Sequence, residues 1–158
     1  MALLTDALPP EAYGLKYDPD TGHFTRNGRR AGYVNRALGY VLISVGNKPV
    51  YAHRLAFAIM AGRSPAEVDH VNGDKSDNRW SNLREASHQE NMCNSRKRAD
   101  NASGFKGVCF FKRTRKWIAY INAGGKRLHL GYFPTAELAH EAYKAASRKH
   151  HGEFGRVA

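Results

Sequence analysis

The alternation of hydrophobic and polar positions divides the chain into three blocks. Residues 10–66 combine short β-branched and aromatic runs with one helical stretch. Residues 67–98 place a polar loop between two strand-like runs and end in a stretch of polar helix formers. Residues 104–158 alternate with a period of two and finish in an amphipathic helix. The polar residues 99–103 predict a linker, so the pattern predicts an α+β protein with domains at 1–98 and 104–158.

Turn residues and aromatic runs give the first block its predicted elements. The sequence Asp-Pro-Asp-Thr-Gly in the middle of 13–26 predicts a β-hairpin. Runs at 39–45 and 50–51 predict further strands, because β-branched and aromatic side chains suit a pleated surface. Residues 53–61 carry apolar side chains and Gly62 follows them, which predicts a short helix with a glycine stop. The first block is therefore expected to be a β-rich leader.

Strict alternation in the third block predicts three strands, at 108–111, 117–122 and 127–130. Thr135 is placed to cap the helix that follows, and Glu137 stands in its first turn, where an acidic side chain is favourable. The apolar positions of this helix form one stripe, which suits packing on a sheet. The block is expected to be a three-stranded antiparallel sheet packed on one helix.

Charge changes this picture more than overall composition does. The chain of 158 residues has 25 Lys and Arg against 14 Asp and Glu, a net charge of +11. A small protein this basic usually binds a polyanion, most often nucleic acid. Between residues 94 and 130 there are ten basic residues and one acidic residue. This concentration favours a binding face, and a soluble basic protein with a solvated face is the alternative.

The two cysteines and the first ten residues indicate in which cellular compartment the protein is expected. Cys93 and Cys109 form no CxxC pair, and no Cys/His cluster has the spacing of zinc ligands. The first ten residues lack the basic and apolar regions of a signal peptide. No stretch reaches the roughly 20 apolar residues of a membrane span. We therefore expect a cytoplasmic protein with free thiols and no membrane partner.

One segment of the second block groups residues that suit phosphodiester hydrolysis. His70 titrates near neutral pH and can activate water. Asp69 and Asn91 offer oxygen donors, which suit a hard divalent cation. Asn82 can hydrogen-bond the backbone across the polar loop and fix the direction of His70. A strand end, a polar loop, a second strand and a helix starting near His88 predict a compact ββα unit.

These residues resemble the HNH motif of homing endonucleases from bacteriophages and introns, which have the ββα-metal fold. The resemblance rests on Asp69-His70, Asn82-Leu83-Arg84 and Glu90-Asn91. It implies that His70 is the general base, that Asp69 and Asn91 bind one divalent metal, and that Asn82 orients His70. Because an amide stands at the last motif position, Mg²⁺ or Mn²⁺ is expected rather than Zn²⁺. The leader positions that also match are Tyr17-Asp18, Thr21-Gly22, Gly39-Tyr40 and His53-Arg54-Leu55.

Five polar residues near this motif each have two interpretations. His53 and Arg54 either anchor the predicted helix to the core or contact phosphate. His88 either joins the metal ligands or is a solvated residue at a helix start. Asp74 and Asp77 either add carboxylates to the site or are turn residues of the loop.

The third block resembles the DNA-binding domain of plant ethylene-response factors of the APETALA type, which also occurs fused to phage HNH nucleases. The matching positions lie within 104–108, 116–119, 130–133 and 135–143. The resemblance implies that the sheet lies in the major groove of double-stranded DNA and that the helix packs behind it. A β-sheet fits the width of the major groove, so this geometry is physically sound.

Strand alternation assigns side chains to the sheet face that would meet DNA. Arg127 is the candidate for a guanine edge and Asn122 for an adenine edge, whereas the lysines would hold phosphate. The plant domains carry arginines at several positions where this chain has Cys109, Phe111 and Asn122, which leaves the target sequence open. Alternatively, Phe111 and Tyr120 pack against the nuclease block. The predicted DNA-binding residues are Arg96, Lys97, Arg98, Lys106, Phe111, Arg113, Arg115, Lys116, Tyr120, Asn122, Arg127 and His129.

The combined prediction is a metal-dependent endonuclease that hydrolyses DNA phosphodiester bonds, a site-preferring nickase of phage or mobile-element type. One active site per chain is the reason to expect a nick. The protein is expected to act on double-stranded DNA as a monomer or weak dimer, without an obligatory protein partner, in the cytosol of a bacterium or an infected host. Two alternatives stay open: a non-catalytic DNA-binding regulator that uses the C-terminal sheet, and a protein that acts on RNA.

Overall fold

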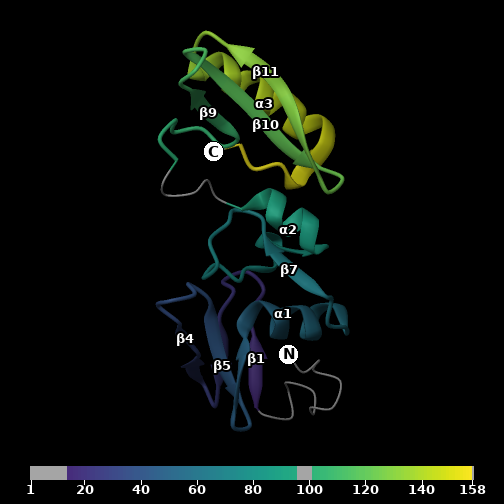
Figure 1. The fold of residues 1–158 in the computed structure, drawn as a ribbon. Coiled ribbons are helices and arrows are strands. Elements are labelled where there is room, and N and C mark those ends of the chain that lie inside the picture. Colours follow the sequence, from purple (N-terminus) through teal and green to yellow (C-terminus); the bar gives the residue numbers. More distant parts are fainter. Residues whose placement is uncertain (1–13, 96–100, 158) are drawn as a thin grey trace. The chain divides into compact units, whose positions relative to one another are not determined.

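The computed structural model describes residues 14–95 and 101–157, and the chain divides into two compact units, Met1–His88 and Gln89–Ala158 (Figure 1). Small antiparallel sheets and three α-helices make up a mixed fold in these residues, in agreement with the α+β prediction. No helix within them is long and apolar enough to cross a membrane. The predicted DNA-binding residues at 96–98 lie outside the described residues.

The first unit begins with the predicted hairpin, which continues into a third strand. β1 (Leu15–Tyr17), β2 (Phe24–Arg26) and β3 (Arg29–Ala31) form an antiparallel sheet in that order. Asp18 builds the turn after β1, because its Oδ1 accepts a hydrogen bond from the backbone N–H of Asp20 at 3.0 Å. The hairpin prediction is confirmed. β3 was not predicted, since its two arginines interrupt any apolar alternation.

A second small sheet leads into the first helix. β4 (Tyr33–Val34), β5 (Val41–Val45) and β6 (Lys48–Tyr51) are antiparallel in that order, and α1 (Ala52–Ala61) follows directly. The helix ends where Gly62 adopts the left-handed conformation with φ 65°. The predicted strands and the glycine-stopped helix are confirmed, with β4 as an addition.

The strands predicted to carry the chemistry come next. β7 (Glu67–His70) and β8 (Leu83–Ala86) form a two-stranded antiparallel sheet. The polar loop between them ends in a 3₁₀ turn, η3 (Trp80–Asn82). α2 (His88–Asn94) follows β8. Two strands and a helix therefore occur in the predicted order along the chain.

One apolar core fixes these pieces of the first unit to one another. Its buried side chains come from both small sheets, from α1 and from the β7–β8 pair. Truncating one buried aliphatic side chain of such a core to alanine costs about 2–5 kcal/mol. Representative members, one from each element, are Leu15, Phe24, Ile43, Leu55, Val68 and Leu83.

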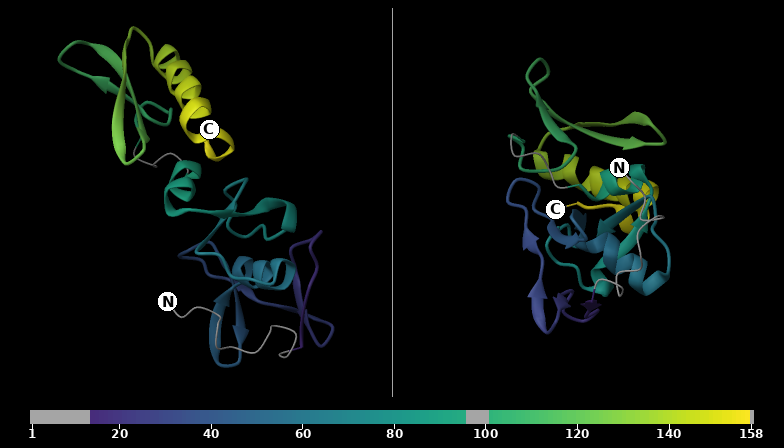
Figure 2. Two further views of the ribbon diagram at one scale, coloured as in Figure 1. Left: turned by 90° about the vertical axis from the view of Figure 1, so that its right-hand side faces the viewer. Right: turned by 90° about the horizontal axis from the view of Figure 1, so that it is seen from below.

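The second unit has the predicted three strands and one long helix. Thr135 caps this helix, because its Oγ1 accepts a hydrogen bond from a backbone N–H of the first turn at 3.3 Å. The helix lies along one face of the sheet (Figure 2). The elements in chain order are β9 (Val108–Phe111), β10 (Lys116–Ala123), β11 (Lys126–Phe133), α3 (Ala136–His151) and the 3₁₀ turn η4 (Gly152–Phe154).

A β-bulge in β11 changes which side chains share the open face of this sheet. Ala119 pairs with Gly131, but Tyr120 pairs with His129, so β11 holds one extra residue at this point. The side chains of β11 therefore exchange faces along the strand. Tyr132, which simple alternation places toward the helix, instead has its ring 4.9 Å from that of His129.

Candidate functional site

Asp69 and His70 end strand β7 inside the first unit. Both residues are buried, with 5% and 4% of their surface exposed. The antiparallel register places Asp69 opposite Arg84 and His70 opposite Leu83. A buried carboxylate and a buried imidazole both require polar partners, and residues of β8 and of the β7–β8 loop provide them.

The side chain of Asn78 fixes the direction and the tautomer of His70. Its Oδ1 lies 3.3 Å from His70 Nε2, and its Nδ2 donates a hydrogen bond to the Ser76 carbonyl at 3.1 Å. Because the second bond orients the amide, Oδ1 faces the ring and Nε2 carries the hydrogen. The lone pair of the neutral ring is then on Nδ1. Asn78 is itself only 2% exposed, so this contact is shielded from solvent.

Burial lowers the pKa of His70 below its usual value. The hydrogen bond to Asn78 and the nearby carboxylates, Asp69 first among them, raise the pKa, but burial outweighs them. The imidazole is therefore neutral at pH 7, and only the neutral form can accept a proton from water.

Asn82, which was predicted to orient His70, ties the two ends of the polar loop together. Its Oδ1 accepts a hydrogen bond from the backbone N–H of Asn72 at 2.9 Å. Its Nδ2 donates to Asn72 Oδ1 at 3.0 Å and to the Asp77 carbonyl at 2.8 Å. These bonds hold the loop that carries Asn78, so Asn82 supports His70 through the loop. A direct role of Asn82 in orienting His70 stays a prediction.

Arg84 holds the carboxylate of Asp69. Its Nε and Nη2 both donate to Asp69 Oδ2, at 2.9 and 2.8 Å, and little of either side chain is exposed. Across residues 14–95 and 101–157, no three His, Cys, Asp or Glu side chains gather where they could hold a metal. A single carboxylate supplemented by amide or water oxygens suits Mg²⁺ or Mn²⁺ and does not suit structural zinc. The donor chemistry of Asp69 therefore fits the expected hard cation.

Asn91, the predicted second metal ligand, lies in α2 and belongs to the second unit. Its metal-binding role stays a prediction. His88 is highly exposed at the start of α2, and its Nδ1 lies 2.7 Å from Glu67 Oε1. This contact favours the interpretation of His88 as a solvated residue at a helix start.

The two loop aspartates serve as turn residues. Asp74 Oδ1 accepts hydrogen bonds from the backbone N–H and the hydroxyl of Ser76, at 2.9 and 2.7 Å. Asp77 accepts a hydrogen bond from Arg79 Nε at 2.9 Å. The hydrogen bonds from Arg79 lower the pKa of Asp77 to about 2. Both aspartates therefore favour the loop interpretation over a place among the metal ligands.

His53 belongs to an aromatic cluster that packs against His70. The ring of His53 stacks on Tyr51 with centroids 5.3 Å apart, and it meets the ring of His70 edge-on at 5.1 Å. Tyr40 contacts both histidine rings, at 5.1 and 6.0 Å. Burial, with smaller contributions from His70 and Arg54, lowers the pKa of His53 to about 3. Arg54 donates hydrogen bonds to the loop after α1, so both residues fit the anchoring interpretation.

The leader hairpin holds the loop segment around Asn78. Tyr17 Oη donates a hydrogen bond to the Asn78 carbonyl at 2.6 Å, across 61 positions of sequence. The backbone N–H of Trp80 donates to the Pro19 carbonyl at 2.9 Å. A Cβ atom at Gly22 would lie 2.5 Å from the carbonyl carbon of Asn78. Asn78 was not predicted as a site residue, because an asparagine in a polar loop is also typical of a turn.

Aromatic and basic side chains line the open face of the sheet in the second unit. Ala119 packs with the core on the α3 side, so its neighbour Tyr120 lies on the opposite face. The guanidinium carbon of Arg127 lies 4.0 Å from the centre of the Tyr120 ring. The Tyr120 ring meets that of His129 at 5.2 Å, and His129 meets Tyr132 at 4.9 Å. Of these residues, Tyr132 was not predicted.

The remaining predicted DNA-binding residues of the second unit surround this face. Phe111 lies 6.1 Å from Tyr132 and 5.6 Å from the guanidinium carbon of Arg113. Asn122 is exposed and pairs with Arg127 across the strands. Arg115 and Lys116 are exposed, at the turn between β9 and β10 and at the start of β10.

Lys106, another predicted DNA-binding residue, makes its described hydrogen bonds at the end of α2 and not on the open face of the sheet. Its Nζ donates hydrogen bonds to the carbonyls of Cys93 and Ser95, at 2.6 and 2.7 Å. Burial lowers the pKa of the Lys106 ammonium. Lys106 therefore caps the C-terminal end of α2, and its contact with phosphate stays a prediction.

Comparison with known proteins gives one family match and several relatives. The family model of HNH endonuclease matches residues 50–93. Protein 3.8 of Escherichia phage T7 is 30% identical over 89 residues, which cover 56% of this chain and 73% of that protein. APETALA2-like protein 2 of Oryza sativa and the AP2-like ethylene-responsive transcription factor TOE2 of Arabidopsis thaliana are each 41% identical over 51 residues, or 32% of this chain. These matches span only 12% and 10% of the two plant proteins. No solved structure gives a significant match.

Proposed function

This chain belongs to the same family as protein 3.8 of Escherichia phage T7 and carries an HNH endonuclease domain, and from that premise we propose that it is a metal-dependent endonuclease that hydrolyses phosphodiester bonds of double-stranded DNA. The observation that carries the proposal is the buried Asp69-His70 pair, with Asn78 on the imidazole, inside the matched residues 50–93. We interpret β7, β8 and α2 as the ββα-metal unit of this family.

His70 is the general base of the proposed reaction. It removes a proton from the attacking water at Nδ1, while its Nε2 hydrogen stays directed at Asn78. Arg84 keeps the Asp69 carboxylate in place. A divalent cation, Mg²⁺ or Mn²⁺, would be held by Asp69 with Asn91 as the ligand predicted from the motif, and it would supply neutralisation of charge on the phosphoryl and leaving 3′ oxygens.

The product of one catalytic event is expected to be a nick. Each chain has one Asp69-His70 pair, and one general base serves one strand at a time. A double-strand cut would need two chains or two successive events. We therefore propose a nickase, with a preference for particular sites that comes from DNA contacts outside the catalytic residues.

We assign those contacts to the open face of the sheet in the second unit, in the manner of the APETALA-type domains. The similarity to the two plant proteins and the exposed basic and aromatic side chains of this face support the assignment. Arg127 is the candidate for a base edge, because a guanidinium fork can contact the O6 and N7 atoms of guanine together. Packing of Phe111 and Tyr120 into an interface is the alternative.

The Arg127→Ala variant is expected to relax sequence preference. Loss of a contact with two atoms of one base should cost about 1–3 kcal/mol at that base pair and much less elsewhere. Selection of bound sites from a random duplex pool, with cleavage blocked by EDTA, measures the effect. The matched control is Lys126→Ala on the same strand, which should weaken binding to all sequences alike. Unchanged preferences in Arg127→Ala would show that this arginine contacts phosphate or nothing.

The Asn78→Asp variant is expected to shift the pH dependence of cleavage upward. In the native chain the lowered pKa of His70 keeps the base neutral to below pH 7, so the rate should fall only in more acidic solution. An aspartate facing Nε2 would favour the imidazolium and raise that pKa, so the acid limb should move up by about one pH unit or more. Initial cleavage rates measured from about pH 5 to about pH 9, at fixed metal concentration, locate the acid limb. This range brackets the usual pKa of a histidine.

Asn47→Asp provides the control for this shift, because it makes the same chemical change in an exposed turn between β5 and β6. Its acid limb should coincide with that of the native protein. An acid limb at the same pH in Asn78→Asp would contradict the assignment of Asn78 as the partner of the base.

The test of the proposed function is cleavage of supercoiled plasmid by the full chain with Mg²⁺, with Mn²⁺ and with EDTA. Nicked product that needs the metal supports the proposal. Intact plasmid in every metal, together with retained DNA binding, would favour the alternative of a DNA-binding regulator in which the HNH domain is scaffold. Competition between duplex DNA and duplex RNA separates DNA action from RNA action.

A further inference from the structure

A second basic region of the chain lies in the leader, away from the residues already assigned to DNA. Between Asp20 and Glu67 the sequence holds seven Lys or Arg residues and no Asp or Glu. Two of the seven lie away from the small sheets, because Arg54 binds the loop after α1 and Arg63 pairs with Glu85. The other five lie on or beside the two small sheets, at Arg26, Arg29, Arg30, Arg36 and Lys48.

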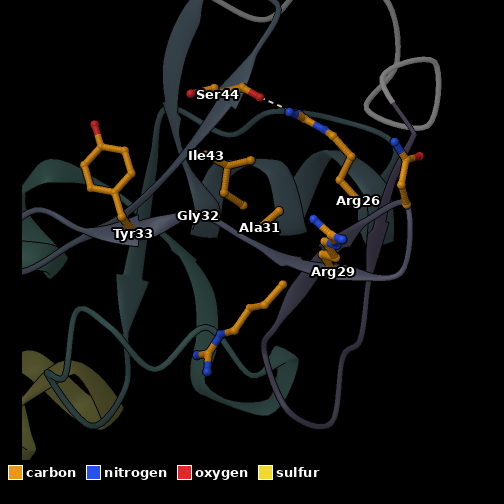
Figure 3. A pocket seen from close by; sticks show the side chains of 9 residues that line it. Arg26, Arg29, Ala31, Gly32, Tyr33, Ile43 and Ser44 are labelled. Carbon is orange, nitrogen blue, oxygen red and sulfur yellow. Dashed lines mark hydrogen bonds between the residues drawn. The ribbon is translucent and has the colours of Figure 1, made fainter.

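Three of these arginines line one hollow of about 640 Å³ (Figure 3). The hollow lies between the β2–β3 hairpin and the β4–β5 pair. Gly32 allows this close packing, since a Cβ there would lie 3.0 Å from Ile43 Cγ1 and from the Leu42 carbonyl oxygen. The polar or aromatic lining residues are Arg26, Asn27, Arg29, Arg30, Tyr33 and Ser44.

Hydrogen-bond donors of the arginines in this hollow remain available to a ligand. Arg26 donates from Nη2 to the Ser44 carbonyl, while its buried Nε has no hydrogen-bond partner. Arg29 and Arg30 are exposed, and neither has an ion-pair partner among the residues that the structure describes. Tyr33 stands beside them with 56% of its surface exposed. A buried donor without an acceptor is costly unless a ligand supplies one.

We propose that this hollow, lined by Arg26, Arg29 and Arg30, binds the phosphate backbone of the DNA substrate as a contact site of the nuclease unit itself. Guanidinium groups match phosphate oxygens in pairs and keep their charge at any working pH. The exposed ring of Tyr33 offers a flat surface for a sugar or base beside that phosphate. The inference rests on the proposed function and adds a DNA contact within the first unit.

The strand β5 links this hollow to the candidate base. Ser44 lines the hollow, and Tyr40, which directly precedes β5, has its ring 6.0 Å from that of His70. Four residues of extended chain span about 13 Å. Base pairs rise about 3.4 Å per step, so this distance is about that of four steps. Chain length therefore places the hollow within about four base-pair steps of Tyr40, whose ring contacts that of His70.

The experiment compares two double variants of the full chain, both made with His70→Ala and assayed in EDTA, so that binding is measured without cleavage. Arg29→Ala/Arg30→Ala removes two charges of the hollow. Arg36→Ala/Lys48→Ala removes two charges outside it. Fluorescence anisotropy with a labelled duplex, repeated over a range of salt concentrations, gives the affinity and its salt dependence for each variant.

The hollow variant is expected to bind duplex about tenfold more weakly, and to reduce the slope of log affinity against log salt by about 2, because each phosphate contact contributes about 0.9. The control should change both quantities much less. Restoring the charges as Arg29→Lys/Arg30→Lys should restore most of the slope, which excludes misfolding as the cause. Equal losses in both double variants, or no loss in the hollow variant, would overturn the proposal.

The design separates this inference from the function on which it rests. A native chain that binds duplex but cuts it in no metal would sink the nuclease proposal, and the binding comparison would still test the hollow. If the native chain nicks DNA and the Arg29→Ala/Arg30→Ala variant binds duplex as tightly as the native chain, only the proposed phosphate contact in the hollow is wrong. Full competition by inorganic phosphate at concentrations that leave the control unaffected would show a small-anion site, and it would also overturn the proposal.

Discussion

The His70→Ala variant is expected to lose about 10²–10⁴-fold in the rate of metal-dependent DNA cleavage, because it removes the proposed general base that takes the proton of the attacking water. Its affinity for duplex DNA should not change, since His70 is buried at the end of β7 and supplies no positive charge at pH 7. Nicking of supercoiled plasmid under single-turnover conditions measures the rate, and anisotropy in EDTA measures binding.

Two companion variants make this result interpretable. His70→Gln keeps a polar side chain of similar length, so it tests whether a loss of rate comes from a cavity in the buried site. His88→Ala removes an exposed histidine that contacts Glu67, and it should cut at nearly the native rate. A His70→Ala protein that is folded and retains more than about a tenth of the native rate would remove His70 from the role of base.

The Gly22→Ala variant should have the largest effect on the stability of the first unit. Gly22 has φ +72°, where an L-residue is strained, and the added Cβ would lie 2.5 Å from the Asn78 carbonyl carbon and closer still to the Arg79 nitrogen. Left-handed strain alone costs about 1–2 kcal/mol. Because backbone atoms must also move, the total loss in the free energy of unfolding should reach about 3 kcal/mol or more.

Gly28→Ala is the matched control, since Gly28 has nearly the same φ, +74°, and a Cβ there would meet no atom within 4 Å. It should show the strain cost without the clash. Urea unfolding of both variants measures the difference, and plasmid nicking should fall further in Gly22→Ala, because the Asn78 segment would shift. Equal free energies of unfolding for the two variants would show that a Cβ at position 22 does not clash with the loop around Asn78.

Local patterns in the sequence predicted most of the elements. The leader hairpin needs only the turn residues between 18 and 22, α1 needs its apolar residues and Gly62, and the three strands of the second unit need alternation. β3 and β4 escaped prediction because they are short and expose most of their side chains. The face of Tyr132 escaped because a single extra residue in β11 reverses the alternation; Gly131, beside that residue, was the one local signal of a bulge.

The candidate site was predictable where the chemistry is contiguous in sequence. Asp69 and His70 are neighbours on one strand, and their spacing to Asn82-Leu83 and Asn91 favours a base beside a metal ligand over a structural pair, a role that stays a prediction. The contact of Asn78 with His70 depends on how the loop folds back, and the support from Tyr17 crosses 61 positions. The hollow lined by Arg26, Arg29 and Arg30 likewise requires two sheets to meet. Tertiary contacts of this kind leave no periodic signal along a chain.

The hydrogen bond from Tyr17 to Asn78 also limits which segment of the chain can be transferred to another protein with its proposed active site intact. An engineer who moves only the segment 67–95 into another scaffold would leave behind the hydroxyl and the Pro19 carbonyl that hold the loop beneath the imidazole. The graft would keep the bonds of Asn78 to His70 and Ser76, but it would lose the two hydrogen bonds that tie this loop to the leader. A functional cassette must therefore include the leader hairpin from Leu15 onward, so the smallest portable unit is nearly three times as long as the motif that identifies it (about 80 residues against about 30, within the size range of small domains).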